Sequence, residues 1–211
     1  MVDTASAGGK GDLQEALDFL ITEEQLGVTF VTAAIESAPG TPSEQFLPVL
    51  RNAVTQEYNH VEALKAVGAT PLTTQYWFPD AAFGDGGIGL FESLEAVETI
   101  EISLYLIGVS AFARAGEEFG ARLCAEAMGT EAVHRALVRF AQGELGKDIG
   151  PPNDVGFENF DFPTLQIVRR SLEDLGIGYG QGSAQPGRFY EYPGDPVASG
   201  VGTPVSHTEP A

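Results

Sequence analysis

Cysteine and basic residues are scarce in this chain of 211 residues, and both shortages exclude classes of protein. The single cysteine, Cys124, rules out an intrachain disulfide framework, a cysteine-based zinc ribbon and an iron–sulfur cluster. Only 11 Lys and Arg stand against 30 Asp and Glu, and the net charge of −19 repels phosphate backbones and anionic membranes. No unbroken apolar run approaches the roughly 18 residues of a membrane-spanning helix. We therefore expect neither a nucleic-acid partner nor membrane insertion.

The start of the chain lacks the apolar core of a targeting signal. Residues 1–12 are small and polar, and we expect them to form a flexible N-terminal arm. The protein is therefore expected to be soluble and cytoplasmic as given, or exported if a signal peptide preceded residue 1. Hydrophobic residues make up 43% of the chain, which is enough for one core. A single domain with extensions is predicted.

Apolar side chains recur at steps of three and four residues through most of the remaining chain, which predicts four long helices and a shorter fifth one. The predicted helices cover residues 13–35, 43–67, 90–115, 117–145 and 161–175. Asp12 is expected to cap the first helix, in a capping box with Glu15. Ser43 is the expected cap of the second helix, although Pro48 also suits a start nearer Leu47.

Glycine, proline and aromatic residues mark the segments between and after these helices. Residues 68–89 form a long connection that we expect to cross over the bundle, fastened by the burial of Tyr76, Trp77, Phe78 and Phe83. The bundle is assigned to residues 13–147, a C-terminal extension with the short helix to 148–180, and a Gly/Pro-rich tail, draping or disordered, to 181–211. No segment shows a convincing strand pattern. The predicted fold class is all-α, a four-helix bundle with a long crossover between its second and third helices.

Two of the three histidines occur in the same local context. Glu57-x-x-His60 and Glu131-x-x-His134 each place a carboxylate and an imidazole on one helix face, because residues i and i+3 lie on the same side. Both pairs continue apolar stripes that face the core. Ionisable groups in a core are costly unless they are paired or bind a metal, so each pair is a candidate metal ligand set.

A glutamate on the inner stripe of each of the other two long helices completes a repeated pattern. Glu24 precedes Glu57 by 33 residues, and Glu98 precedes Glu131 by the same 33. A single offset of 74 residues superposes the three candidate ligands of the first half on those of the second. Equal spacing at three positions indicates an internal duplication of a helical hairpin.

This layout resembles the ferritin-like carboxylate-bridged dimetal proteins, in which a four-helix bundle supplies Glu from two helices and Glu-x-x-His from the other two. The stretch ALDFLITEEQLGVTF is similar to the first-helix pattern of the ferritin-like domain of desiccation-related proteins. That register selects Glu24 rather than Glu23 and, in SLEAVETIEISLYL, it selects Glu98. The resemblance covers about residues 13–145 and implies a ferritin-like fold.

The resemblance also implies a cofactor of two divalent metal ions. Iron is preferred and manganese second, because the donor set is rich in oxygen and has one imidazole per ion. One ion would be held by Glu24, Glu57 and His60 and the other by Glu98, Glu131 and His134, with Glu57 and Glu131 as the expected bridges. The implied activity is iron oxidation or redox chemistry with peroxide or O₂, in a stress-related role. The alternatives are a manganese catalase-like activity and a non-catalytic desiccation or stress scaffold with a degenerate or structural metal site. A homodimer is the assembly that base rates favour.

Residues around the six predicted ligands carry weaker patterns. Glu101 shares a helix face with Glu98 and is an additional candidate ligand, a rim carboxylate being the alternative. Gln56 and Thr130 stand where many family members carry an acidic residue that holds the metal-bound histidine. Glu23 and Glu95 are expected to be solvated, Cys124 to be an inert buried thiol, and His207 to take no part in the site. Tyr58 and Tyr105 are expected to pack in the core, and the alternatives are a hydrogen bond to a ligand or a role in carrying an electron.

Overall fold

The computed structural model describes residues 10–211. The predicted N-terminal arm therefore lies outside the described residues, except for its last three residues, which belong to the first helix. The helices are α1 Lys10–Ser37, η1 Pro42–Phe46, α2 Leu47–Ala66, η2 Asp80–Ala82, α3 Ile88–Ala115, α4 Glu118–Glu144 and α5 Leu165–Asp174, where η1 and η2 are short 3₁₀ helices. The strands are β1 Gln75–Pro79, β2 Gly178–Tyr179 and β3 Gly187–Glu191. The predominantly helical architecture predicted from the sequence is confirmed.

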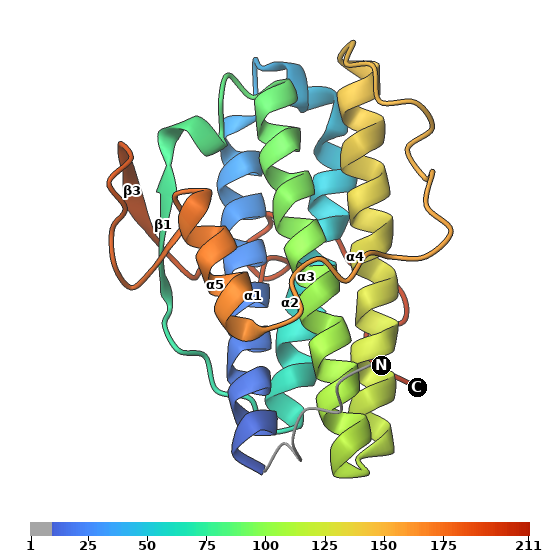
Figure 1. The fold of residues 1–211 in the computed structure, drawn as a ribbon. Helices are drawn as coiled ribbons and strands as arrows, with labels where there is room; N and C mark the ends of the chain where they lie inside the picture. The colour runs from blue at the N-terminus through green and yellow to red at the C-terminus, as the bar shows by residue number, and fades with distance from the viewer. Residues whose placement is uncertain (1–9) are drawn as a thin grey trace.

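The four long helices α1 to α4 pack side by side along their lengths (Figure 1). α1 and α2 form one antiparallel hairpin, and α3 and α4 form another. The connection from α2 to α3 runs back along the outside of α1, so α2 and α3 point in the same direction (Figure 1). This connection contains β1 and η2, and it places the two Glu-x-x-His helices, α2 and α4, on either side of a shared interior.

The ends of α1 and α2 differ from the expected caps. α1 begins at Lys10, so Asp12 lies within its first turn and is not the N-cap. Ser43 is buried inside η1, and α2 begins at Leu47 with Pro48 in its first turn, where the missing amide hydrogen costs no helical hydrogen bond. The predicted alternative start of the second helix is therefore the observed one.

The apolar helix α3 runs through the protein core. It is long and apolar enough to cross a membrane, with a mean hydropathy of 1.5 over an 18-residue window, but 61% of that window is buried inside the protein. As the sequence indicated, no unbroken apolar run of this length occurs, because Glu98 and Glu101 interrupt the helix, and the window is apolar only on average. A mostly buried helix of this composition is also what the core of a folded protein contains.

A small antiparallel sheet, with strand order β2-β1-β3, corrects the expectation of an all-α chain without strands. Gln75 pairs with Glu191 and Trp77 with Gly178, so the strands join segments more than 100 residues apart. Tyr76 and Phe78 are fully buried beneath the sheet, and Phe78 stacks on Phe30 of α1 with ring centroids 4.9 Å apart. The expected burial of the crossover is thus confirmed for these two aromatic residues, whereas Trp77 and Phe83 are half-buried.

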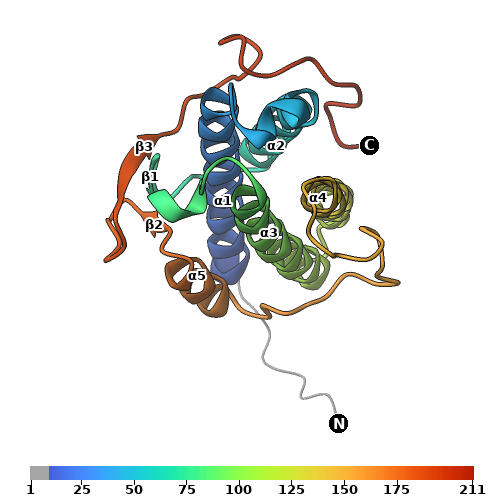
Figure 2. The same ribbon diagram turned by 90° about the horizontal axis from the view of Figure 1, so that it is seen from above.

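The C-terminal residues after β3 drape over the helices, which was one of the two predicted alternatives. From β3 the chain passes across the outside of α2 and ends beside α4 (Figure 2). Arg51 of α2 donates hydrogen bonds to the carbonyl oxygens of Gly200 and Val201 at 3.1 and 3.0 Å. The Thr203 amide donates to the Arg51 carbonyl oxygen at 3.1 Å, and the Ala211 amide donates to the Glu126 carboxylate on α4 at 3.0 Å.

Replacing Arg51 with alanine should loosen this segment. The substitution removes both guanidinium hydrogen bonds, and we expect the segment to lose roughly 1 kcal/mol of local stability. Hydrogen–deuterium exchange of residues 196–211 measures this effect, with Arg114→Ala on the exposed surface of α3 as the control. Equal exchange in the two variants would contradict the anchoring role of Arg51.

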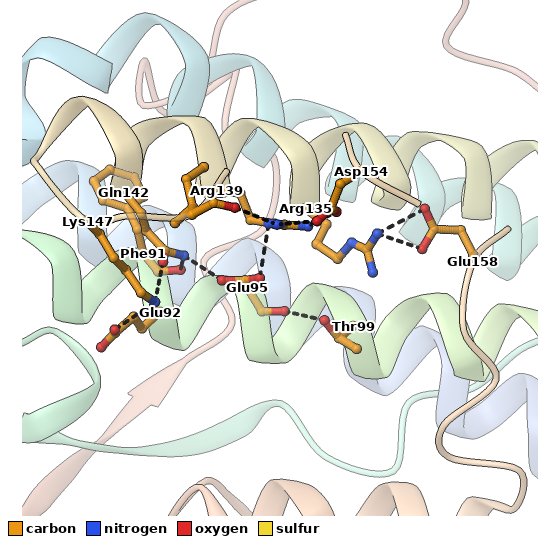
Figure 3. A network of polar contacts seen from close by, with 11 residues as sticks. Phe91, Glu92, Glu95, Thr99, Arg135, Arg139, Gln142, Lys147, Asp154 and Glu158 are labelled. Carbon is orange, nitrogen blue, oxygen red and sulfur yellow. Dashed lines mark hydrogen bonds and ion pairs between the residues drawn. The ribbon is translucent and has the colours of Figure 1, made fainter. Parts of the chain in front are cut away.

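A polar network ties the outer faces of α3 and α4 together (Figure 3). Glu95 of α3 accepts a hydrogen bond from Gln142 at 2.7 Å and lies 3.6 Å from the Arg139 guanidinium. Arg139 in turn contacts Asp154 at 2.6 Å, and Arg135 contacts Glu158 at 3.0 Å. Glu95 is therefore a half-buried bridge between helices and not the freely solvated side chain that was expected.

Candidate metal centre

All six predicted ligands meet in the interior between α1, α2, α3 and α4. Their carboxylates are almost completely removed from solvent, with relative exposures of 1% for Glu24 and Glu57, 4% for Glu98 and 0% for Glu131. His134 is 3% exposed and the His60 side chain 14%, so the His60 side faces solvent more than the rest of the cluster. The spacing of each Glu-x-x-His pair brings its two side chains to one helix face, as the sequence predicted.

One set of donor atoms surrounds His60. Glu24, Glu57, His60 and Glu131 each offer one ligand atom, and these atoms lie within 4.8 Å of one another. The His60 Nδ1 atom is 2.7 Å from Glu131 Oε1 and 3.2 Å from Glu24 Oε2. Three carboxylates and one imidazole therefore converge on a volume that could hold one metal ion.

A second set of donor atoms surrounds His134. It consists of Glu57, Glu98, Glu131 and His134, again with one ligand atom each within 4.8 Å of one another. The His134 Nδ1 atom lies 2.9 Å from Glu131 Oε2, 3.0 Å from Glu57 Oε1 and 3.6 Å from Glu98 Oε2. Glu57 and Glu131 thus belong to both sets.

Burial and mutual repulsion raise the pKa of several carboxyl groups in the centre. For Glu24 and Glu98, loss of hydration is the largest cause, and the neighbouring Glu57 and Glu131 add to it. Burial also raises the pKa of Glu101 well above its usual range, again with help from the surrounding carboxylates. Like charges crowded in a poorly hydrated core favour protonation until a cation arrives.

The negative charge of the neighbouring carboxylates also shifts the pKa values of the two histidines. Burial alone would lower the pKa of His60, but the Glu24 and Glu131 carboxylates outweigh it and raise this pKa well above 6.5. The pKa of His134 is raised in the same way, mainly by Glu98 and Glu131. Burial opposes ionisation of Glu131, but the two imidazoles beside it hold its pKa far below 4.5. In the absence of metal, the imidazolium groups partly neutralise the carboxylates.

Gln56 orients one of the histidines. His134 Nε2 lies 3.0 Å from Gln56 Oε1 on α2, and this contact crosses from one hairpin to the other. An amide oxygen only accepts hydrogen bonds, so Nε2 carries a hydrogen, and the Nδ1 lone pair of a neutral imidazole is left for a cation held between the carboxylates. Gln56, which stands where the proteins that the sequence resembles often carry an acidic residue, therefore holds the histidine of the opposite helix.

Tyr105 corrects the expectation of simple core packing. Its side chain is fully buried, and its hydroxyl donates a hydrogen bond to Glu24 Oε1. The ring also meets the His60 ring edge-on, with centroids 6.0 Å apart. The sequence-based alternative, a hydrogen bond to one of the predicted ligands, is therefore the observed arrangement, and it restrains the Glu24 carboxylate.

Glu101 lies beside the two sets of donor atoms without belonging to either. Its side chain is 1% exposed, and Oε1 has no hydrogen-bond partner among the described residues. Gly27 of α1 faces it, because a Cβ atom at position 27 would lie 3.4 Å from Glu101 Oε1 and 2.8 Å from Glu57 Oε2. Glu101 and Gly27 are separated by the 74-residue offset of the duplication, so one half has a carboxylate where the other leaves room for it.

The substitution Gly27→Ala should weaken metal binding. The new methyl group would force the Glu57 carboxylate away from α1, and we expect a loss of about tenfold or more in metal affinity. Isothermal titration with Co(II) measures the change. Gly129→Ala on α4 is the matched control, because a Cβ there meets nothing within 4 Å. Equal affinities in the two variants would show that Glu57 does not need its observed position.

Two residues outside the predicted set are placed differently from expectation. Glu23 is 1% exposed, not solvated, and accepts a hydrogen bond from the Tyr179 hydroxyl of β2. His207, expected to lie apart from the site, is exposed but lines a cavity of about 200 Å³ that reaches His60. In contrast, Cys124 is buried as predicted, and burial raises the pKa of its thiol to about 12. The sequence could not show the positions of Glu23 and His207, because both depend on how the C-terminal part of the chain packs against the helices.

The residues present suit a hard or borderline divalent metal. Glu57 Oε2 and Glu98 Oε2 are buried and lack a hydrogen-bond partner among the described residues, which is costly unless a cation satisfies them. Carboxylate oxygens with one imidazole per set are donors for such a cation and not for metals that prefer sulfur. The structure thus contains buried Glu/His clusters that could bind metal. Comparison of the chain with known protein families, with curated proteins and with solved structures finds no match.

Proposed function

We propose that this protein is a ferritin-like dimetal protein that acts in iron oxidation or in redox chemistry with peroxide or O₂. The observation that carries the proposal is the sharing of Glu57 and Glu131 by the two sets of donor atoms. A carboxylate placed between two such sets can bridge two ions, which isolated metal sites do not need. Four long helices, each contributing to one buried centre, agree with this class of fold.

The charges of the centre also support a pair of divalent ions. The carboxylates of Glu24, Glu57, Glu98 and Glu131 carry four negative charges when ionised, which two divalent cations balance while the imidazoles stay neutral. We propose iron as the preferred metal and manganese as the second. When bound, a pair of reduced ions would supply the electrons for reduction of O₂ or peroxide.

The protein's own groups would set the geometry of this centre. Tyr105 holds Glu24 by its hydroxyl, and Gln56 holds His134 by its amide. Glu101 is buried beside Glu57, its Oε1 has no hydrogen-bond partner in the described part of the chain, and it is the additional candidate ligand. Since Nδ1 of both histidines faces carboxylates that a metal would neutralise, we expect metal binding to release protons.

Anaerobic titration with Fe(II), combined with metal analysis of the purified protein, tests the proposal. We expect two equivalents of Fe(II) per chain and oxidation of the bound iron when O₂ or peroxide is added. The variant Glu57→Ala with His60→Ala should keep its helical circular dichroism spectrum and lose this oxidation. A purified protein that holds no iron or manganese and takes up neither would contradict the proposed function.

A second candidate is a non-catalytic stress or desiccation scaffold in which the metal is structural. The observation that favours it is the C-terminal segment, whose residues 205–210 line the cavity on the His60 side together with α2 and α4. In this case metal would bind and raise the melting temperature, but neither O₂ nor peroxide would be consumed. Oxygen evolution from peroxide by the manganese-loaded protein would instead indicate the catalase-like alternative.

A further inference from the structure

A small apolar cavity leads to the half of the centre that contains His134. It has a volume of about 90 Å³, and each of the four long helices contributes to its wall. The wall includes one apolar side chain from each helix in turn, Val31, Leu50, Leu94 and Val138. The polar residues Glu98 and His134 line the cavity where it meets the candidate metal centre. The outer rim reaches the surface, where Val49 and Leu137 are each 37% exposed.

The size and walls of this cavity restrict what can occupy it. Glu98 and His134 are the polar residues that the described part of the chain contributes to its lining, so most of the wall offers no hydrogen-bond partner to a buried water, which needs two to four. Engineered apolar cavities of roughly 150 Å³ stay dry and bind benzene or xenon. A smaller cavity of the same character suits a smaller apolar molecule.

The other side of the centre is more polar. The cavity of about 200 Å³ at His60 has a mixed lining from α2, α4 and the C-terminal segment, in which apolar side chains such as Leu123 alternate with polar ones, among them Gln56, Asn59, Glu126 and His207. Water, peroxide and hydrated cations would enter there more favourably. An apolar molecule would instead partition into the cavity at His134, because transfer from water to an apolar cavity is favourable for apolar surface.

We propose that the apolar cavity is a binding site for dioxygen beside Glu98 and His134. The choice of dioxygen rests on the proposed function, since a reduced metal pair at the inner end would use it. The affinity of the cavity for a small apolar gas does not depend on a metal. The two approaches would deliver reactants of different polarity to opposite halves of one centre.

Xenon, a small apolar gas, tests the cavity in the metal-free protein. We expect saturable chemical-shift changes under xenon pressure in the methyl groups of Val31, Leu50, Leu94 and Val138, and none in Leu123 of the polar cavity. The absence of a saturable change, or equal changes at Leu123, would overturn the proposal. Because no metal is present, this result is independent of whether the protein oxidises iron.

A filled cavity provides the second test. Ala141→Leu adds a side chain to the cavity wall, and Ala125→Leu makes the same change on the exposed face of the same helix. We expect Ala141→Leu to abolish the xenon-induced shifts and to slow oxidation of bound Fe(II) by O₂ about tenfold. Oxidation by peroxide and the behaviour of Ala125→Leu should stay unchanged. Equal slowing with both oxidants would overturn the dioxygen site, whereas failure to bind Fe(II) in the unsubstituted protein would count against the proposed function alone.

Discussion

Replacing Glu57 or Glu131 with glutamine is expected to abolish binding of both metal ions, whereas replacing Glu24 or Glu98 removes only one. The first two carboxylates belong to both sets of donor atoms, and the last two belong to one set each. A glutamine amide offers one neutral oxygen in place of a bridging carboxylate, so we expect affinity to fall by more than about 100-fold for both ions.

Metal stoichiometry after equilibrium dialysis against Co(II) measures this difference directly. We expect two ions per chain in the unsubstituted protein, none in Glu57→Gln and Glu131→Gln, and one in Glu24→Gln and Glu98→Gln. Glu62→Gln on the exposed face of α2 is the matched control, and it should retain both ions. The loss of a single ion in all four variants would indicate two independent sites without bridging carboxylates.

The stability of the metal-free protein should fall as the pH rises above about 5. The pKa values of Glu24, Glu98 and Glu101 are raised by burial, and those of His60 and His134 are raised by the neighbouring carboxylates. Between the unfolded and the raised folded pKa values, the native state binds more protons than the unfolded state, so deprotonation destabilises it. Each excess proton costs about 1.4 kcal/mol per pH unit.

The lowered pKa of Glu131 acts in the opposite direction, but only at low pH. Its contribution is present above the unfolded value of 4.5 and is lost as the pH falls further. Guanidinium unfolding of the metal-free protein at pH 5, 6, 7 and 8 therefore measures the decline. A free energy of unfolding that rises between pH 5 and pH 8 would contradict the raised pKa values of the buried glutamates and histidines.

Binding of a divalent metal ion and the substitution Glu101→Gln should each restore part of the stability that the metal-free protein loses as the pH rises. A divalent ion at about 1,000 times its dissociation constant should add about 4 kcal/mol to the free energy of unfolding. Glu101→Gln removes a buried carboxylate whose Oε1 finds no hydrogen-bond partner among residues 10–211, so it should stabilise the metal-free protein at pH 8 more than at pH 5. Glu62→Gln again serves as the control, because it alters an exposed charge.

The long helices and the cluster of candidate ligands could be predicted because their patterns are local or repeated. Apolar spacing defines a helix within a few turns, and an i, i+3 pair such as Glu57 and His60 shares a face wherever that helix packs. The 33-residue and 74-residue spacings then identify Glu24 and Glu98 among 30 acidic residues. The net charge of −19 argued only against nucleic-acid and membrane partners. The positions of the glutamates and histidines along the helices were needed to identify the candidate metal centre.

Contacts between distant segments decided the rest. Strand β1 is recognisable only with β3, whose partner residues Gln75 and Glu191 are 116 positions apart. Glu23 is buried because Tyr179 reaches it, and His134 is oriented because Gln56 belongs to the facing hairpin. The sequence alone contains the helical periodicity and the spacing of the candidate ligands. The tertiary structure decided the pairing of the strands, the partners of the buried polar atoms and the two cavities. Each of these forms only when the helices and the C-terminal segment pack together, because each depends on contacts between residues that are far apart in the sequence.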